Sequence, residues 1–285
     1  MNASISITPS VCPQQNHLLA ALPAVDFERL RPHLKLVHLS LGEVLCESGS
    51  HLRHVYFPTT ALVSKLYTLA DGAPTEVAMV GNDGFIGVPL LLGGNTTLTQ
   101  AVVKCDGYAQ QLPAQVLLEH LARGETLQRV LLRYAMTLLT QMAQIAVCYR
   151  HHLVDQQLAR LLLMNLDRLP SNKLVMTQES ISNMLGVRRE SITDAVHKLQ
   201  IAGVVATRRG QITVLNRAAL EKISCECYAM IRKEYDRLLP TQLHPDSATG
   251  SLVFNRALRP VLQSRLEQGL VTKGRAHTNL QAVEC

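Results

Sequence analysis

The sequence predicts an α+β chain in which a strand-rich half precedes a long helix and a second, mainly helical half. Short β-branched or alternating segments fill residues 36–112, and Gly, Asp and Asn turn signals separate them. No Gly or Pro interrupts residues 125–167, which is long for one globular helix. Two short amphipathic patterns separated by one glycine follow at residues 177–200. Together these patterns indicate two domains joined by a helix.

The composition is that of an ordinary folded protein, with 47% hydrophobic and 18% charged residues in 285. The first Lys or Arg is Arg29, and no apolar run approaches the roughly 20 residues of a membrane span, so we expect neither a secretory signal nor a membrane helix. The protein is therefore expected in the cytoplasm. Seven scattered cysteines predict reduced thiols rather than a disulfide framework. The isolated Cys225-Glu-Cys227 does not predict a metal site, and no metal ligand is expected.

The N-terminal half divides into a flexible leader, residues 1–15, and a compact antiparallel barrel or sandwich over residues 16–120. Short helices broken at Pro23 are expected between His17 and Leu34. The predicted strands, in chain order, are Leu36–Leu41, Val44–Cys46, His54–Phe57, Ala61–Thr68, Thr75–Val80, Gln100–Cys105 and Tyr108–Leu112.

A long helix over residues 121–153 is expected to pair two subunits. Its predicted dimer seam, spaced alternately by three and four residues, is Leu132, Ala135, Leu139, Met142, Ala146 and Tyr149. A second apolar stripe for packing on the barrel consists of Leu127, Leu131, Tyr134, Leu138 and Ile145. Each apolar stripe needs a surface to pack against. The alternative to a dimer is that both stripes pack within a helical bundle of the same chain. A break near residues 151–155 is expected to end this helix, with Asp155 as a possible N-cap of the helix that follows.

Residues 154–220 carry the pattern of a helix-turn-helix with a basic hairpin, or wing. Thr177 is placed to cap the first helix, Gly186 supplies the tight turn, and Ile192 and Val196 bury one side of the second helix. Residues 171–220 hold seven basic residues against three acidic ones, which favours a polyanion as partner. The predicted DNA-contacting residues are Thr177, Arg188, Arg189, Glu190, Thr193 and Asp194, with Arg208 and Arg209 in the wing.

Two segments complete the chain. Residues 221–239 are predicted as a C-terminal helix, continuous with a segment that Asn216 caps. Residues 240–285 lack periodicity and are expected to form a mobile tail.

This order of segments resembles the Crp/Fnr family of bacterial transcription regulators over about residues 17–220. Gly186-Val-Arg-Arg-Glu-Ser-Ile is similar to the family's Gly-x-x-Arg-Glu-Thr-Val signature, and Leu41-Gly-Glu-Val-Leu resembles the start of its β-roll. The resemblance implies a cyclic-nucleotide-binding-like β-roll, a dimerisation helix and a winged helix-turn-helix. It also implies duplex DNA and RNA polymerase as partners, and Arg189 and Glu190 as the base-reading pair. Asp194 stands where the cyclic-AMP receptor has a base-contacting arginine, so a different target site is expected.

The effector implied by the resemblance is not cyclic AMP. Family members that bind cyclic nucleotides use a Phe-x-Gly-Glu run and a later arginine, whereas this chain has Phe85-Ile86-Gly87-Val88 and a leucine, Leu98, near the arginine position. A buried phosphate without its charged partner would be costly. The expected effector pocket would be lined by Phe85, Gly87, Val88, Leu98, Thr99 and Met142.

The sequence also bears on other cofactors and on other classes of function. An iron–sulfur sensor of the Fnr kind needs an N-terminal cysteine cluster, but only Cys12 lies there. Haem stays possible, because axial ligands are available from His38, Cys46, His51, His54 and Cys105. No set of catalytic residues can be assembled from the motifs, so an enzyme is not expected. The alternative to a DNA-binding regulator is an effector-binding module that acts through a protein partner.

Overall fold

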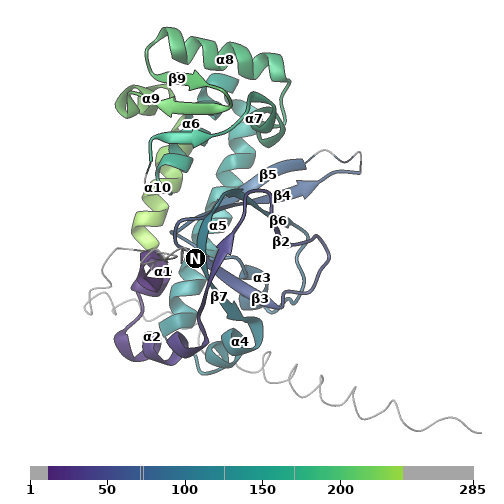
Figure 1. Ribbon diagram of the computed structural model, residues 1–285, viewed down its shortest axis with the longest axis vertical. Coiled ribbons are helices and arrows are strands. Elements are labelled where there is room, and N and C mark those ends of the chain that lie inside the picture. The colour runs from purple at the N-terminus through teal and green to yellow at the C-terminus, as the bar shows by residue number, and fades with distance from the viewer. Residues whose placement is uncertain (1–11, 71, 73, 125, 170, 240–285) are drawn as a thin grey trace, which may run out of the picture. The chain divides into compact units, whose positions relative to one another are not determined.

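The computed structural model describes residues 12–239, apart from residues 71, 73, 125 and 170 (Figure 1). The predicted tail, residues 240–285, lies outside the described residues, as does most of the predicted leader. The described chain begins with a 3₁₀ turn, η1 (Pro13–Gln15), and two short helices, α1 (His17–Ala20) and α2 (Ala24–Leu30). A second 3₁₀ turn, η2 (Arg31–His33), leads into the strands.

All seven strands predicted for the N-terminal half are present, with small shifts at their ends. They are β1 (Lys35–Leu39), β2 (Val44–Cys46), β3 (His54–Pro58), β4 (Leu62–Thr68), β5 (Pro74–Val80), β6 (Gln100–Cys105) and β7 (Gly107–Pro113). They form two antiparallel sheets, in the orders β1-β7-β3 and β2-β6-β4-β5. Leu39, Val63, Val80 and Val103 pack together in their core. This is the predicted β-roll, with a short helix α3 (Val88–Leu91) inserted after β5.

The long helix is shorter at its start than predicted. The chain forms α4 (Ala114–Ala122), breaks, and then forms α5 (Thr126–His151). Gly124 adopts a positive φ of 69° at the break, a conformation that glycine accepts without steric cost. The stripe predicted to pack on the barrel is buried. Its members are Leu127, Leu131, Tyr134, Leu138 and Ile145. The Tyr134 ring lies 5.4 Å from the ring of Phe85 in the β-roll.

A second apolar stripe on α5 is exposed, but it is rotated from the predicted seam. Its large members are Leu132, Met136, Leu139 and Val147. Of the predicted seam, Ala135 is buried within this chain, and the Tyr149 hydroxyl donates to the carbonyls of Glu76 in β5 and of Met184. By length and composition α5 could also cross a membrane, a property shared by core helices of soluble proteins.

The C-terminal half is built on helices with a small three-stranded sheet. Its elements are α6 (Val154–Leu166), β8 (Lys173–Val175), α7 (Gln178–Leu185), α8 (Arg189–Ile201), β9 (Val205–Arg208), β10 (Gln211–Val214), α9 (Arg217–Ile223) and α10 (Glu226–Leu238). The strand order is β8-β10-β9. Leu162, Ile181, Ile192 and Leu199 belong to a core that also includes Leu62 and Met79 of the β-roll.

Two predictions about helix ends are wrong. Asp155 does not cap α6; Leu153 holds the N-cap position, and its backbone N–H donates to the Gln156 side chain. The predicted C-terminal helix is two helices, because the chain is extended at Ser224 and Cys225. Asn216 does cap the first of them, accepting a hydrogen bond from the Ala219 backbone.

Candidate nucleic-acid interface

The turn between α7 and α8 has the local geometry that the sequence predicts. The Thr177 hydroxyl caps α7 by accepting a hydrogen bond of 3.0 Å from the Ser180 backbone N–H. Gly186 ends α7 in the left-handed conformation, with φ of 65°. The inward residues Ile192, Val196 and Leu199 are buried, so α8 is fixed on the domain by its apolar face.

The polar residues at the N-terminal end of α8 are exposed together. Arg188 occupies the N-cap position, and Arg189, Glu190 and Asp194 follow on the outer face. Within the described part of the chain, no ion pair holds any of these four side chains. The Thr193 hydroxyl lies 2.9 Å from the Gln178 side-chain oxygen, which links α8 to α7. The structure thus brings together the predicted α8 residues and leaves their charged groups available for a ligand.

The wing is a two-residue hairpin. Arg208 pairs with Gln211, and the two residues between them, Arg209 and Gly210, both have positive φ, at 43° and 75°. Positive φ at both central positions is the signature of a type I′ turn. Arg209 is the one non-glycine residue with positive φ among the described residues, so the turn holds an arginine in an unfavourable conformation. Arg208 and Arg209 are both exposed.

Lys198, at the other end of α8, has a partner within the chain. Its ammonium lies 2.8 Å from a carboxylate oxygen of Asp155 in α6. This hydrogen bond raises the pKa of Lys198. The charge therefore attaches α8 to α6 and adds less to the outer face than its sequence position suggests.

The structure does not gather the residues predicted for the effector pocket around one cavity. Phe85 is buried, with its ring stacked 5.5 Å from that of Phe57, and Val88 is buried beside it. Leu98 is 70% exposed, and Thr99 is buried in a hydrogen bond with Thr97. Met142 is half-buried and Gly87 has φ of 148°. The Phe85 ring also lies 5.4 Å from the Tyr134 ring of α5, so it packs between the β-roll and that helix.

A cleft of about 390 Å³ lies instead between the β-roll and α7. Ser64 and Lys104 line it from the β-roll, and Thr177 and Asn183 line it from the α7 side. Behind it, the Glu76 carboxylate accepts hydrogen bonds from the Ser64 hydroxyl and the buried Lys104 ammonium. Sequence reasoning missed this cleft because its walls come from segments far apart in the chain.

The residues considered as haem ligands do not converge. His38, His51 and His54 are exposed on the β-roll. Cys46 and Cys105 are half-buried, and burial raises the pKa of both thiols.

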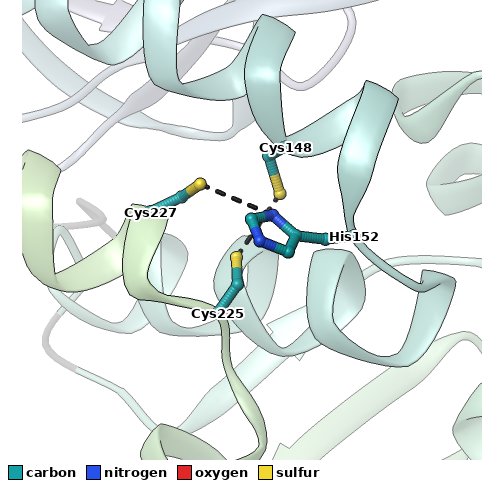
Figure 2. Close-up of side chains that lie close together, drawn as sticks. All are labelled: Cys148, His152, Cys225 and Cys227. Atoms are coloured by element: carbon teal, nitrogen blue, oxygen red, sulfur yellow. Dashed lines mark hydrogen bonds between the residues drawn. The ribbon is translucent and has the colours of Figure 1, made fainter.

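A different group of potential metal ligands does converge, although the sequence predicted none. Single donor atoms of Cys148, His152, Cys225 and Cys227 all lie within 4.8 Å of one another (Figure 2). The Cys225-x-Cys227 pair and the four-residue spacing of Cys148 and His152 were visible signals, but the separation between the two pairs concealed their proximity.

The fold combines a β-roll with a winged helix-turn-helix whose second helix, α8, has an exposed N-terminal end. Residues 156–223 match the family described as the Crp-like helix-turn-helix domain. A search of curated proteins gave no match.

Solved structures, among them regulators of the Crp/Fnr family, share the fold. FixK2 from Bradyrhizobium japonicum is 18% identical, with a TM-score of 0.57, over 67% of this chain and 98% of its own. A regulator of the Crp/Fnr family from Eubacterium rectale is 17% identical, with a TM-score of 0.58, over 74% and 98%. A Crp-family regulator from Thermus thermophilus is 20% identical, with a TM-score of 0.57, over 66% and 96%. Residues 156–223 thus carry a Crp-like helix-turn-helix domain, and the described chain shares the fold of these solved regulators.

Proposed function

We propose that the protein is a homodimeric, sequence-specific transcription regulator that places the N-terminal end of α8 in the major groove. The observation that carries this proposal is the exposed group of Arg188, Arg189, Glu190 and Asp194, which has no ion-pair partner among the described residues. The position is the one at which a recognition helix meets base edges. The protein would act in the cytoplasm, with RNA polymerase as a further partner and without enzymatic activity.

Base reading would depend on Arg189 and Glu190. An arginine fork donates to O6 and N7 of guanine together, and a glutamate accepts from N4 of cytosine. Asp194, one helical turn beyond Glu190, would repel phosphates and favour a base donor in the groove. Such a set of side chains selects a sequence rather than binding every duplex equally.

The exposed stripe of α5 supports a twofold dimer. Leu132, Met136 and Leu139 follow each other at spacings of four and three residues, which is the pattern of a helix pair. A twofold axis along this helix pair would place two α8 helices on half-sites about 34 Å apart.

An effector acting on the β-roll would change DNA binding by shifting this pairing. Because Val88 and Leu98 replace the polar ligands, that effector would not be cyclic AMP.

Replacing Arg189 with Ala tests the proposal directly. We expect affinity for the selected site to fall about 5- to 150-fold, since one good bidentate contact is worth about 1–3 kcal/mol. Preference at the corresponding base pair should be lost as well. The site would be selected from a random duplex library with the wild-type protein, and affinities measured by fluorescence anisotropy at fixed salt.

The matched control is Arg31→Ala, which removes the same charge from an exposed pair with Glu28 in the β-roll. It should leave both affinity and base preference unchanged. Unaltered affinity and preference in the Arg189 variant would contradict the assignment of α8 as the recognition helix.

A substitution in the wing should change stability and DNA affinity in opposite directions. Arg209→Asn should raise the free energy of unfolding by about 0.5–1 kcal/mol, because asparagine accepts the left-handed conformation and Asn-Gly is the preferred type I′ pair. The same change should weaken binding to all duplexes, and lower the slope of log affinity against log salt by about 0.9 for one lost phosphate contact.

Arg208→Asn is the control for this pair of effects, since it removes a neighbouring wing charge from a residue in regular strand conformation. It should reduce the salt slope without a gain in stability. Urea denaturation and anisotropy titrations at several salt concentrations measure both quantities. A stabilised Arg209 variant with an unchanged salt slope would show that the wing does not touch phosphates.

A further inference from the structure

The four converging side chains described above join the end of α5 to the start of α10. Cys148 lies in the last turn of α5, and the His152 backbone N–H donates to the Cys148 carbonyl at 3.1 Å, which continues the helical turn. The two side chains therefore project from one helix face. Cys225 is the N-cap residue of α10, and Cys227 lies in its first turn. Figure 2 shows all four side chains pointing toward one another.

The distances within this group are those of ligands around one tetrahedral metal ion. Bonds of about 2.3 Å to sulfur and about 2.0 Å to nitrogen place two sulfur atoms about 3.8 Å apart, and a sulfur about 3.5 Å from a nitrogen. The sulfur atoms of Cys148 and Cys225 are 3.5 Å apart. The Cys227 sulfur is 3.6 Å from Nδ1 of His152. Three sulfurs and one imidazole form a donor set that zinc prefers in closed structural sites.

The outer surroundings of His152 also fit a ligand. Its other ring nitrogen, Nε2, lies 3.3 Å from a carboxylate oxygen of Glu226. A metal-binding histidine commonly donates its second N–H to a carboxylate, which fixes the tautomer and orients the ring. Nδ1 is then left as the unprotonated nitrogen that faces the three sulfurs.

A buried cation supplies the charge that such a site requires. Three thiolates and one divalent ion carry a net charge of −1. The Arg160 guanidinium is 1% exposed, and its Nε donates to the Cys148 sulfur at 3.3 Å. Among the described residues it forms no ion pair with a carboxylate, and its Nη2 has no hydrogen-bond partner. A buried guanidinium without a counter-charge is costly, so an anionic metal–thiolate centre beside Arg160 accounts for its burial.

We propose that Cys148, His152, Cys225 and Cys227 bind one thiophilic divalent metal ion of the zinc class. The three thiols lose their protons on binding, and the ion completes the link between α5 and α10. Leu153, between α5 and α6, follows His152 directly, and the His152 carbonyl accepts a hydrogen bond from Gln157 of α6. The ion would therefore fix the point at which the DNA-binding domain leaves the dimer helix. The proposal does not depend on the proposed DNA sequence preference.

The first test is the metal content of the full-length protein, purified under reducing conditions and measured by plasma mass spectrometry. We expect one zinc per chain in the wild type and in the control Cys105→Ser, whose thiol lies in the β-roll. The double variant Cys225→Ser/Cys227→Ser and the variant His152→Gln should lose this stoichiometric metal. Wild-type protein with no bound metal that also takes up none from a zinc buffer would overturn the proposal.

Cobalt is the second probe, and it needs no variant that risks misfolding. Metal-free wild-type protein titrated with Co²⁺ should develop tetrahedral d–d bands and sulfur-to-cobalt charge transfer, saturating at one equivalent. Glu226→Gln should keep these bands but raise the dissociation constant roughly 10- to 100-fold, because Glu226 positions the imidazole. Octahedral cobalt spectra, or a disulfide among the three cysteines in freshly reduced protein, would contradict the site.

Discussion

Replacing Arg168 with Ala should lower the free energy of unfolding by about 3–5 kcal/mol, because it leaves a buried carboxylate without its partner. The guanidinium of Arg168 lies 2.6 Å from one Asp83 oxygen and donates to the other at 3.1 Å. It also donates to the Met164 carbonyl and to the Gln141 side chain. Both charged side chains are nearly inaccessible to water, so water cannot replace the lost hydrogen bonds.

This ion pair joins the β-roll to the mainly helical C-terminal half of the chain. Asp83 follows β5 in the β-roll, and Arg168 follows α6 in the DNA-binding half. The Tyr235 hydroxyl of α10 donates to the Asp83 carbonyl at 2.6 Å. The loss should therefore appear in the unfolding of both halves, measured by urea denaturation with circular dichroism.

Arg237→Ala provides the control for the same residue change. Arg237 forms a bidentate pair with Glu234 in the exposed part of α10, where removing an ion pair costs about 1 kcal/mol or less. In addition, Asp83→Ala introduced into the Arg168→Ala background should cost less than it does alone, since the carboxylate is already unpaired. Equal losses of unfolding free energy for Arg168→Ala and Arg237→Ala would show that the buried ion pair stabilises the fold no more than an exposed one does.

Features that depend on interactions within a few residues could be predicted from the sequence, whereas features that depend on tertiary packing could not. Strands and the turn at Gly186 depend on alternation, capping and backbone preference over a few residues, and these were predicted with small shifts. The break at Gly124 was a local signal too, but the predicted helix was extended through it. Burial of Phe85 against Phe57 and Tyr134 could not be predicted, because those rings are brought together only by tertiary packing.

The candidate metal ligands show the same limit more sharply. Cys148 and Cys225 are 77 positions apart, and only the packing of α10 on α5 brings their sulfurs to 3.5 Å. A spacing rule for metal motifs detects ligands on adjacent turns and fails when two half-sites come from separate helices. Arg160 carried no signal at all, since its lack of a carboxylate partner is visible only once the chain is folded.

Introducing a charge on the exposed stripe of α5 should separate the proposed dimer. Leu139 is 54% exposed in the single chain and lies between Met136 and Ala143 on that stripe. A twofold interface contains each substituted position twice, so Leu139→Glu would bury two carboxylates close to each other. With a penalty of several kcal/mol for each buried ion, we expect the dimer dissociation constant to rise by about 10³-fold or more. Sedimentation equilibrium over a concentration series measures this change.

Val25→Glu is the control, because Val25 is a 64% exposed apolar residue on α2, outside α5. It should leave the dimer and its affinity for a two-half-site duplex intact. The Leu139 variant should keep the fold and bind a single half-site as well as the wild-type chain does, while losing the gain from simultaneous contact with two half-sites. If the Leu139 variant remained dimeric with wild-type affinity for the full site, α5 would not be the pairing surface. The exposed stripe would then need another apolar partner, since a continuous surface of this kind on a soluble helix marks an interaction site.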